Sequence, residues 1–220
     1  GRIVHSGGMV VKNVSGYDMN KLYIGSWGSL GILVRANLKL APLPKAEGTL
    51  VLEGIPRAEA DHLVSELRDG PFPLVSAVFK GKRLSLGFEG LPGVLDEQVR
   101  AAREKAGRGT QWIPGIPART ERPAVFVLRL HYPPAAHAAL LDEIKPEAEE
   151  RSLLGSGVTW LEWARVPAPE AVLRIREACA RHGGWAVVER PALSWEIPAP
   201  ALDAMSRLKS MLDPKGTFGP

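Results

Sequence analysis

The fold is indicated first by residues 49–70, whose sequence is TLVLEGIPRAEADHLVSELRDG. Residues 49–53 are apolar and typical of a strand. Pro56 suits the first turn of a helix, because an N–H group at that position has no partner inside the helix. Gly70 ends the helix, and the apolar residues between recur at helical spacing on one face: Ala60, Leu63, Val64 and Leu67. This segment predicts a strand followed by an amphipathic helix.

The same kind of unit continues and then recurs along the chain. Residues 74–79 and 84–88 predict a hairpin with its turn at Lys80–Lys82, followed by a helix over 92–106 that Gly107 ends. The second round is predicted as a strand at 124–130, a helix over 134–150, a strand at 158–164, a helix over 169–182 and a strand at 185–189. Two such rounds predict an α+β fold, in which helices cover one face of an antiparallel sheet.

The two ends of the chain have a different character. Residues 18–24 predict a short helix capped by Asp18, and residues 32–40 alternate as a half-buried strand does. Residues 200–212 predict a helix, and a turn at 213–216 follows it. The helix would turn one apolar face inward: Leu202, Met205, Leu208 and Leu212. We therefore divide the chain into 1–47, 48–198 and 199–220.

The composition excludes several classes of protein. The chain has 220 residues, of which 45% are hydrophobic and 24% charged, so it is not a disordered chain. A net charge of +4, spread along the sequence, does not indicate a nucleic-acid partner. A single cysteine, Cys179, excludes an internal disulfide and a cysteine-cluster metal site, and we expect it to be buried and inert.

No apolar run approaches the ~20 residues of a membrane span. We expect a cytoplasmic location. The chain begins without Met, and we expect it to be a fragment or a processed product.

Three glycines, Gly25, Gly28 and Gly31, recur at every third residue. This spacing suits neither a regular helix nor an ordinary strand. It suits main chain that passes close to a flat ligand, where a Cβ atom would intrude. The alternative is a tight loop between two elements.

Two motifs in this region carry a resemblance to a known family. Residues 12–18, KNVSGYD, resemble the K-N-V-A-G-Y-D signature of FAD-linked oxidases of the vanillyl-alcohol-oxidase type. Residues 25–32, GSWGSLGI, look like the G-S-x-G-T-L-G-[IV] segment of the same family. The tail at 213–220, DPKGTFGP, and the lack of a Glu after Ser26 are similar to the FAD-binding chains of bacterial glycolate oxidases.

The resemblance implies a fold and a cofactor. Residues 1–47 would be the remaining part of a two-subdomain FAD-binding domain, 48–198 a cap domain with an internal repeat, and 199–220 a helix and tail that return to the FAD-binding domain. The family's subdomain that holds the pyrophosphate would precede Gly1, so we expect weak or no FAD binding by this chain alone. The residues implied to bind FAD are Asn13, Gly16, Tyr17, Asp18, Gly28, Ser29, Leu30, Gly31 and Ile32.

The resemblance also implies a function. The chain would be the FAD-binding subunit of a 2-hydroxy-acid (glycolate) oxidase or dehydrogenase complex, in which a hydride passes from the substrate to the flavin. The implied partners are a sister flavin subunit, an iron–sulfur subunit and a small 2-hydroxy acid. Any peripheral attachment to a membrane would come through partners.

The alternative is a non-catalytic assembly module with a vestigial flavin site, for which the six Trp residues would suit an interface. The catalytic residues are unknown, because the family's G-H-x-G-D-G-N motif does not occur here, and a hydrolytic triad lacks any motif.

Other polar residues are assigned structural roles. The five histidines show no metal-ligand spacing. Glu162, Glu189 and Glu196 lie near Trp residues in the sequence, which can raise the pKa of a carboxyl group and make it an acid. The other interpretation, which we favour, is that these Trp residues pack the sheet or a subunit contact.

Overall fold

The computed structural model describes residues 3–8, 18–26, 28–70, 74–107, 109–117, 124–191 and 199–218. The chain divides into two compact units. The larger unit runs from Pro42 to Glu196. The smaller unit combines Gly1–Ala41 with Ile197–Pro220, so the two ends of the chain belong together.

The larger unit contains two rounds of the order strand–helix–strand–strand–helix–strand. The first round consists of β1 (Ala46–Glu53), α2 (Arg57–Arg68), β2 (Ser76–Lys80), β3 (Arg83–Gly90), α3 (Pro92–Ala106) and β4 (Gln111–Pro114). The second consists of β5 (Phe126–His131), a 3₁₀ turn (Pro134–Ala136) with α4 (His137–Ile144), β6 (Glu149–Leu153), β7 (Val158–Trp163), α5 (Pro169–Arg181) and β8 (Trp185–Arg190).

All eight strands form one antiparallel sheet in the order β4-β1-β3-β2-β6-β7-β5-β8. Counted from the outer edge of the sheet to its middle, each round places its own strands in the same order: fourth, first, third and second. This is the ferredoxin-like arrangement, occurring twice within one sheet. The predicted α+β fold with a repeated antiparallel unit is confirmed.

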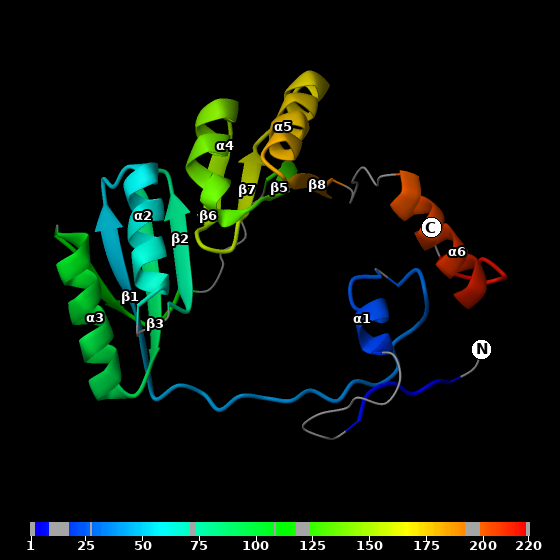
Figure 1. Cartoon of the computed structure of the whole chain (residues 1–220), viewed down its shortest axis with the longest axis horizontal. Helices are drawn as coiled ribbons and strands as arrows, with labels where there is room; N and C mark the ends of the chain where they lie inside the picture. The colour runs from blue at the N-terminus through cyan, green and yellow to red at the C-terminus, as the bar shows by residue number, and fades with distance from the viewer. Residues whose placement is uncertain are drawn as a thin grey trace. The chain divides into compact units, whose positions relative to one another are not determined.

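Each half of the sheet has its own hydrophobic core under its own pair of helices. Figure 1 shows α2 and α3 against the strands of the first half, and α4 and α5 beside those of the second. The strand residues alternate, so that Leu84, Leu86 and Phe88 of β3 enter the first core, as Leu128 and Leu130 of β5 enter the second. Helices are thus found on one face of the sheet in the described residues.

The helices of the larger unit follow the predicted signals where these are strong. The α2 residues Ala60, Leu63, Val64 and Leu67 are buried as predicted. Helix α3 has Pro92 at its start, and Gly107 ends it with a left-handed φ of 58°.

The prediction of one helix over 134–150 is wrong beyond residue 144. Lys145 adopts a φ of 40° and ends α4, Pro146 cannot continue a helix, and β6 follows from Glu149. The strand gave no apolar signal, because its buried-side residues Glu150 and Ser152 make polar contacts instead. Strand β4 was also missed.

Two predictions for the smaller unit are wrong. The predicted strand over residues 32–40 does not form, and Val34 is 76% exposed. A strand needs a ladder partner, and no described strand pairs with this segment.

Helix α6 (Ala199–Leu212) forms as predicted, but Leu202 and Met205 of its supposed inward face are 50% and 48% exposed. The short apolar run Met9–Val11, which also predicts a strand by its sequence, lies outside the described residues.

Candidate functional site

The glycine-rich segment lies in the smaller unit, directly after helix α1 (Met19–Tyr23). Gly25 and Gly28 have left-handed φ values of 83° and 80°, and no atom lies within 4 Å of where a Cβ would stand at either residue. L-residues are disfavoured in this conformation, so the backbone itself calls for glycine. Among the described residues, and apart from each glycine's chain neighbours, the main chain is therefore bare on the side where a Cβ would project.

The third glycine has an internal reason as well. A Cβ at Gly31 would stand 3.4 Å from the Tyr23 ring of α1, at the short end of ordinary van der Waals contact. Gly31 thus lets the segment pass close over α1. Leu30 before it is half-buried, and Ile32 after it is exposed.

Asp18 begins α1, as its sequence position predicts. Its carboxylate accepts a hydrogen bond from the amide of Asn20 at 3.2 Å and thereby caps the helix. The other predicted residues of the first motif, Asn13, Gly16 and Tyr17, lie outside the described residues, as does Trp27.

Ser29 uses its hydrogen-bond donors locally. Its amide and its hydroxyl both donate to the carbonyl of Ser26, at 2.9 and 2.7 Å. Neither group is left to donate a hydrogen bond to a ligand, because both donors are used within the loop. Its carbonyl oxygen has a different partner, which comes from the other end of the chain.

Lys209 of α6 ties the glycine segment to the C-terminal tail. Its ammonium group donates to the carbonyls of Ser29 at 2.6 Å and Phe218 at 2.8 Å, and it pairs with the Asp213 carboxylate at 2.8 Å. Asp213 in turn accepts from the amides of Thr217 and Phe218. The ammonium of Lys209 and these amides lower the pKa of Asp213 to about 2.

The tail therefore meets the segment that the sequence singles out for FAD. The sequence predicted the turn at 213–216 but not the role of Lys209. A signal was present, because Lys209 and Asp213 stand four residues apart at the end of a helix.

A carboxylate and a tryptophan do meet on the sheet face that lacks helices in the described part of the chain. Glu189 pairs with Arg129 at 2.5 Å and accepts a hydrogen bond from the Trp160 indole at 3.1 Å. The Arg151 guanidinium lies 4.1 Å from the centre of the Trp160 ring. Glu189 is an ion-pair partner, which favours a packing role over that of an acid. Glu196 and Trp195 lie outside the described residues.

Two histidines and the cysteine of the larger unit make contacts that are typical of structural roles. The His131 ring stacks on Trp185, and burial followed by the charge of Arg129 lowers the pKa of His131. His182 follows α5 and contacts Glu143 at 2.8 Å. The thiol of Cys179 is buried 3.4 Å from two backbone carbonyls, and burial raises its pKa to about 11. No group of three potential metal ligands occurs among the described residues.

None of the described helices combines the length and the apolar character that crossing a membrane requires.

The chain is similar in sequence to several known proteins. The whole chain aligns with the glycolate oxidase subunit GlcE of Escherichia coli (strain K12) at 28% identity, and the aligned part is 61% of that protein. A stretch of 51 residues, 23% of the chain, is 45% identical to 11% of the glycolate oxidase subunit GlcD of Bacillus subtilis (strain 168). A stretch of 87 residues, 40% of the chain, is 28% identical to 20% of a D-lactate dehydrogenase of Archaeoglobus fulgidus.

The chain thus spans about three fifths of the GlcE relative, at 61%, and smaller shares of the other two. No protein-family model matches it. The relatives are oxidases and dehydrogenases of 2-hydroxy acids, or subunits of such enzymes. The resemblance to FAD-linked oxidases predicted from the sequence is thereby confirmed, and along its full length this chain is similar to a glycolate oxidase subunit.

Proposed function

We propose that this chain is the FAD-binding subunit of a complex that oxidises 2-hydroxy acids such as glycolate. The names of the relatives supply the class of reaction. The observation that carries the proposal is the bare main chain at Gly25 and Gly28, with open space where side chains would stand. A flat ring system can approach such a segment without meeting a Cβ atom.

The proposed contacts between the described residues and the cofactor run through the backbone. The main chain of Gly28, Ser29, Leu30, Gly31 and Ile32 would lie along FAD, and Lys209 would fix this stretch by holding the Ser29 carbonyl. Asp18 would orient the segment through α1, and Asn13, Gly16 and Tyr17 are proposed to join it. When bound, FAD accepts the hydride that leaves the α-carbon of the substrate. The chain's own part is to bind and orient, and we assign no catalytic side chain to it.

The complex would include a sister flavin subunit and an iron–sulfur subunit. FAD would bind weakly to this chain alone, because one exposed stretch of main chain encloses little of a ligand of this size. Gly28 is exposed, and the amide and hydroxyl of Ser29 already donate hydrogen bonds to the Ser26 carbonyl. The test of the proposal therefore uses the protein purified together with the chains that accompany it.

The test compares two glycines of the same conformation. Gly28 and Gly54 have φ values of 80° and 70°, and neither has an atom within 4 Å of its Cβ position. Replacing either by Ala has a similar backbone cost of roughly 1–2 kcal/mol, but Gly54 lies in the larger unit, in the turn between β1 and α2. We expect Gly28→Ala to weaken FAD binding by at least about tenfold, measured as flavin per complex, and Gly54→Ala to leave it unchanged. Equal flavin content in both variants and the wild type would contradict the proposal.

The second candidate function is a non-catalytic assembly module of the same complex. Exposed apolar residues favour it, because Trp185 of the edge strand β8 is 54% exposed and Leu38 and Leu40 are 80% and 82% exposed. The same purified material separates the two functions. An assembly module would retain its partner chains while this chain's flavin content is zero in the wild type as well.

A further inference from the structure

The two halves of the sheet meet at a seam where strand pairing is short. Strands β2 and β6 share the register pairs Val78↔Leu153 and Phe79↔Ser152, whereas β1 and β3 pair along the whole of both strands. The two hydrophobic cores share no residue, and among the described residues the first core reaches past the seam only through Leu154, which follows β6. Other contacts must therefore help to hold the halves together.

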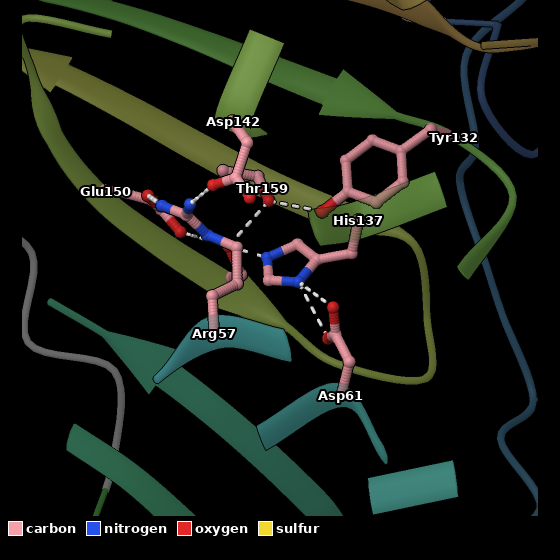
Figure 2. A network of polar contacts seen from close by, with 8 residues as sticks. Arg57, Asp61, Tyr132, His137, Asp142, Glu150 and Thr159 are labelled. Atoms are coloured by element: carbon pink, nitrogen blue, oxygen red, sulfur yellow. Dashed lines mark hydrogen bonds and ion pairs between the residues drawn. The ribbon is translucent and has the colours of Figure 1, made fainter. Parts of the chain in front are cut away.

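A cluster of charged side chains lies over the seam (Figure 2). Arg57 and Asp61 come from α2 of the first half, and His137, Asp142 and Glu150 come from α4 and β6 of the second. We call these five residues the seam cluster. Arg57 pairs with Asp142, and with Glu150 at 2.6 Å. Each of these ion pairs joins one half to the other.

His137 occupies the middle of the seam cluster. Its Nδ1 lies 2.7 and 2.9 Å from the two oxygens of Asp61, and its Nε2 lies 3.8 Å from Glu150. The His137 side chain is 3% exposed and that of Glu150 is 11% exposed. The ring thus stands between two carboxylates that belong to different halves, in surroundings where water screens charge poorly.

The charge of the seam cluster depends on one proton. With His137 protonated, two cations face three carboxylates. With His137 neutral, Arg57 alone faces Asp61, Asp142 and Glu150, and the ion pair across the seam through Asp61 is lost. Removing the charge from one partner of a buried pair leaves the other partner uncompensated, which is costly.

The seam cluster is also connected to the interior of the second half. The Ser152 hydroxyl donates to the Glu150 carboxylate at 3.1 Å, so it must accept from Thr159 at 2.7 Å. Thr159 in turn accepts from the Tyr132 hydroxyl at 2.5 Å. The ionised Glu150 therefore orients three hydroxyl groups in series, and a change at the seam reaches the second core.

We propose that the seam cluster is a proton-controlled joint: protonated His137 fastens the two halves of the sheet to each other, and loss of this proton lets β2 and β6 separate more readily. The proposal concerns the larger unit alone and does not rest on FAD binding.

The direction of the pH dependence follows from the groups around the ring. Burial opposes the charged form of His137, but the carboxylates of Asp61 and Glu150 outweigh it and raise its pKa. Protonated His137 therefore stabilises the seam fully below the unfolded pKa of about 6.5, and this contribution is lost as the pH rises through the higher folded value.

The other groups around the ring do not reverse this direction. Burial opposes ionisation of Glu150, but His137 and Arg57 outweigh it and lower its pKa, so its contribution is present above the ordinary value and is lost only in acid. Burial raises the pKa of Tyr132, which therefore keeps its proton throughout. Asp61, Asp142 and Arg57 are the remaining charged groups of the seam cluster. Beside the cluster, Lys80 of β2 pairs with Glu149 of β6 at 3.0 Å, and this second ion pair also crosses the seam.

The test is hydrogen exchange on the full chain at about pH 6 and about pH 9, corrected for the intrinsic pH dependence of exchange. We expect the backbone amides of residues 152–154 at the seam to exchange at least about tenfold faster at the higher pH, relative to the β1 and β3 amides. His137→Gln should remove this difference. His62→Gln is the matched control, because His62 is on α2, 76% exposed and paired with Glu66, and should retain the difference.

Two results would overturn the proposal. One is seam exchange in the wild type that does not change with pH relative to the β1–β3 pair. The other is an unchanged pH difference in His137→Gln. If that variant does not fold, Asp61→Asn replaces it, with the same expectation of a reduced difference. The wild-type comparison needs no variant.

Discussion

Lys209 holds three parts of the smaller unit at one point. Its ammonium group reaches the Ser29 carbonyl of the glycine segment, the Phe218 carbonyl of the tail and the Asp213 carboxylate at the end of α6. The Lys209 side chain is 25% exposed and that of Asp213 is 3% exposed, so water can replace these contacts only in part. At the scale of single residues, this ammonium group decides whether the tail stays against the candidate cofactor segment.

Lys209→Met should release the tail while leaving the larger unit intact. Hydrogen bonds to a charged group are each worth about 1.5–3 kcal/mol, so we expect the tail to open roughly ten to a hundred times more often. The measurement is hydrogen exchange at the amides of Thr217 and Phe218, both of which bond to Asp213. Lys215→Met, at an exposed position of the same tail, is the control and should leave these amides protected. Equal protection in the two variants would show that Lys209 does not anchor the tail.

At the scale of elements, the turn between β6 and β7 is fixed by a close approach of main chain to main chain. The Gly157 carbonyl accepts a hydrogen bond from the amide of Tyr132 at 2.9 Å. A Cβ at Gly157 would stand 1.8 Å from the Tyr132 carbonyl oxygen, and the φ of Gly157 is 65°. Backbone atoms cannot move aside as the end of a flexible side chain can, so this position admits no side chain without displacing an element.

Gly157→Ala should therefore lower the free energy of unfolding by about 2–4 kcal/mol, through combined clash and backbone strain. Gly93→Ala is the control, because Gly93 lies in α3 with nothing within 4 Å of its Cβ position. Since Ala is the better helix former, this control should be neutral or stabilising by up to about 1 kcal/mol. Denaturant unfolding of both variants measures the difference. A Gly157→Ala protein as stable as the control would contradict the contact.

The elements that the sequence predicted are those with an apolar period or a strong stop signal. Strand β3 alternates Leu84, Leu86 and Phe88, and α3 ends at Gly107 in the conformation that glycine favours. Strand β6 was not predicted, because its sequence EERSL carries polar residues toward the seam cluster. The end of α4 at Lys145 was misplaced, since a left-handed lysine gives no signal in a sequence.

The whole molecule depends on contacts that no local spacing reveals. His137 meets Asp61 across 76 positions of sequence, and Lys209 meets Ser29 across 180. The glycines of the candidate site could be singled out because their backbone requirement is local. Their anchor could not, because it depends on the two ends of the chain folding into one unit.

At the same scale, the proposed function rests on two observations together: the similarity to glycolate oxidase subunits and the bare main chain at Gly25 and Gly28. The GlcE relative aligns with the whole chain, and the chain spans 61% of it. The alignment thus runs through both the larger and the smaller unit, while the cofactor contact is proposed for the smaller unit alone. Of the three glycines, Gly25 and Gly28 have open space beside them.

The most direct measurement is photoaffinity labelling of the native complex with an azido derivative of FAD, followed by peptide mapping. Because residues 28–32 are proposed to lie against the cofactor, we predict light-dependent labelling of the peptide that contains them, and unmodified FAD in excess should suppress it. Labelling confined to accompanying chains, with none on residues 18–40 of this chain, would contradict the central claim.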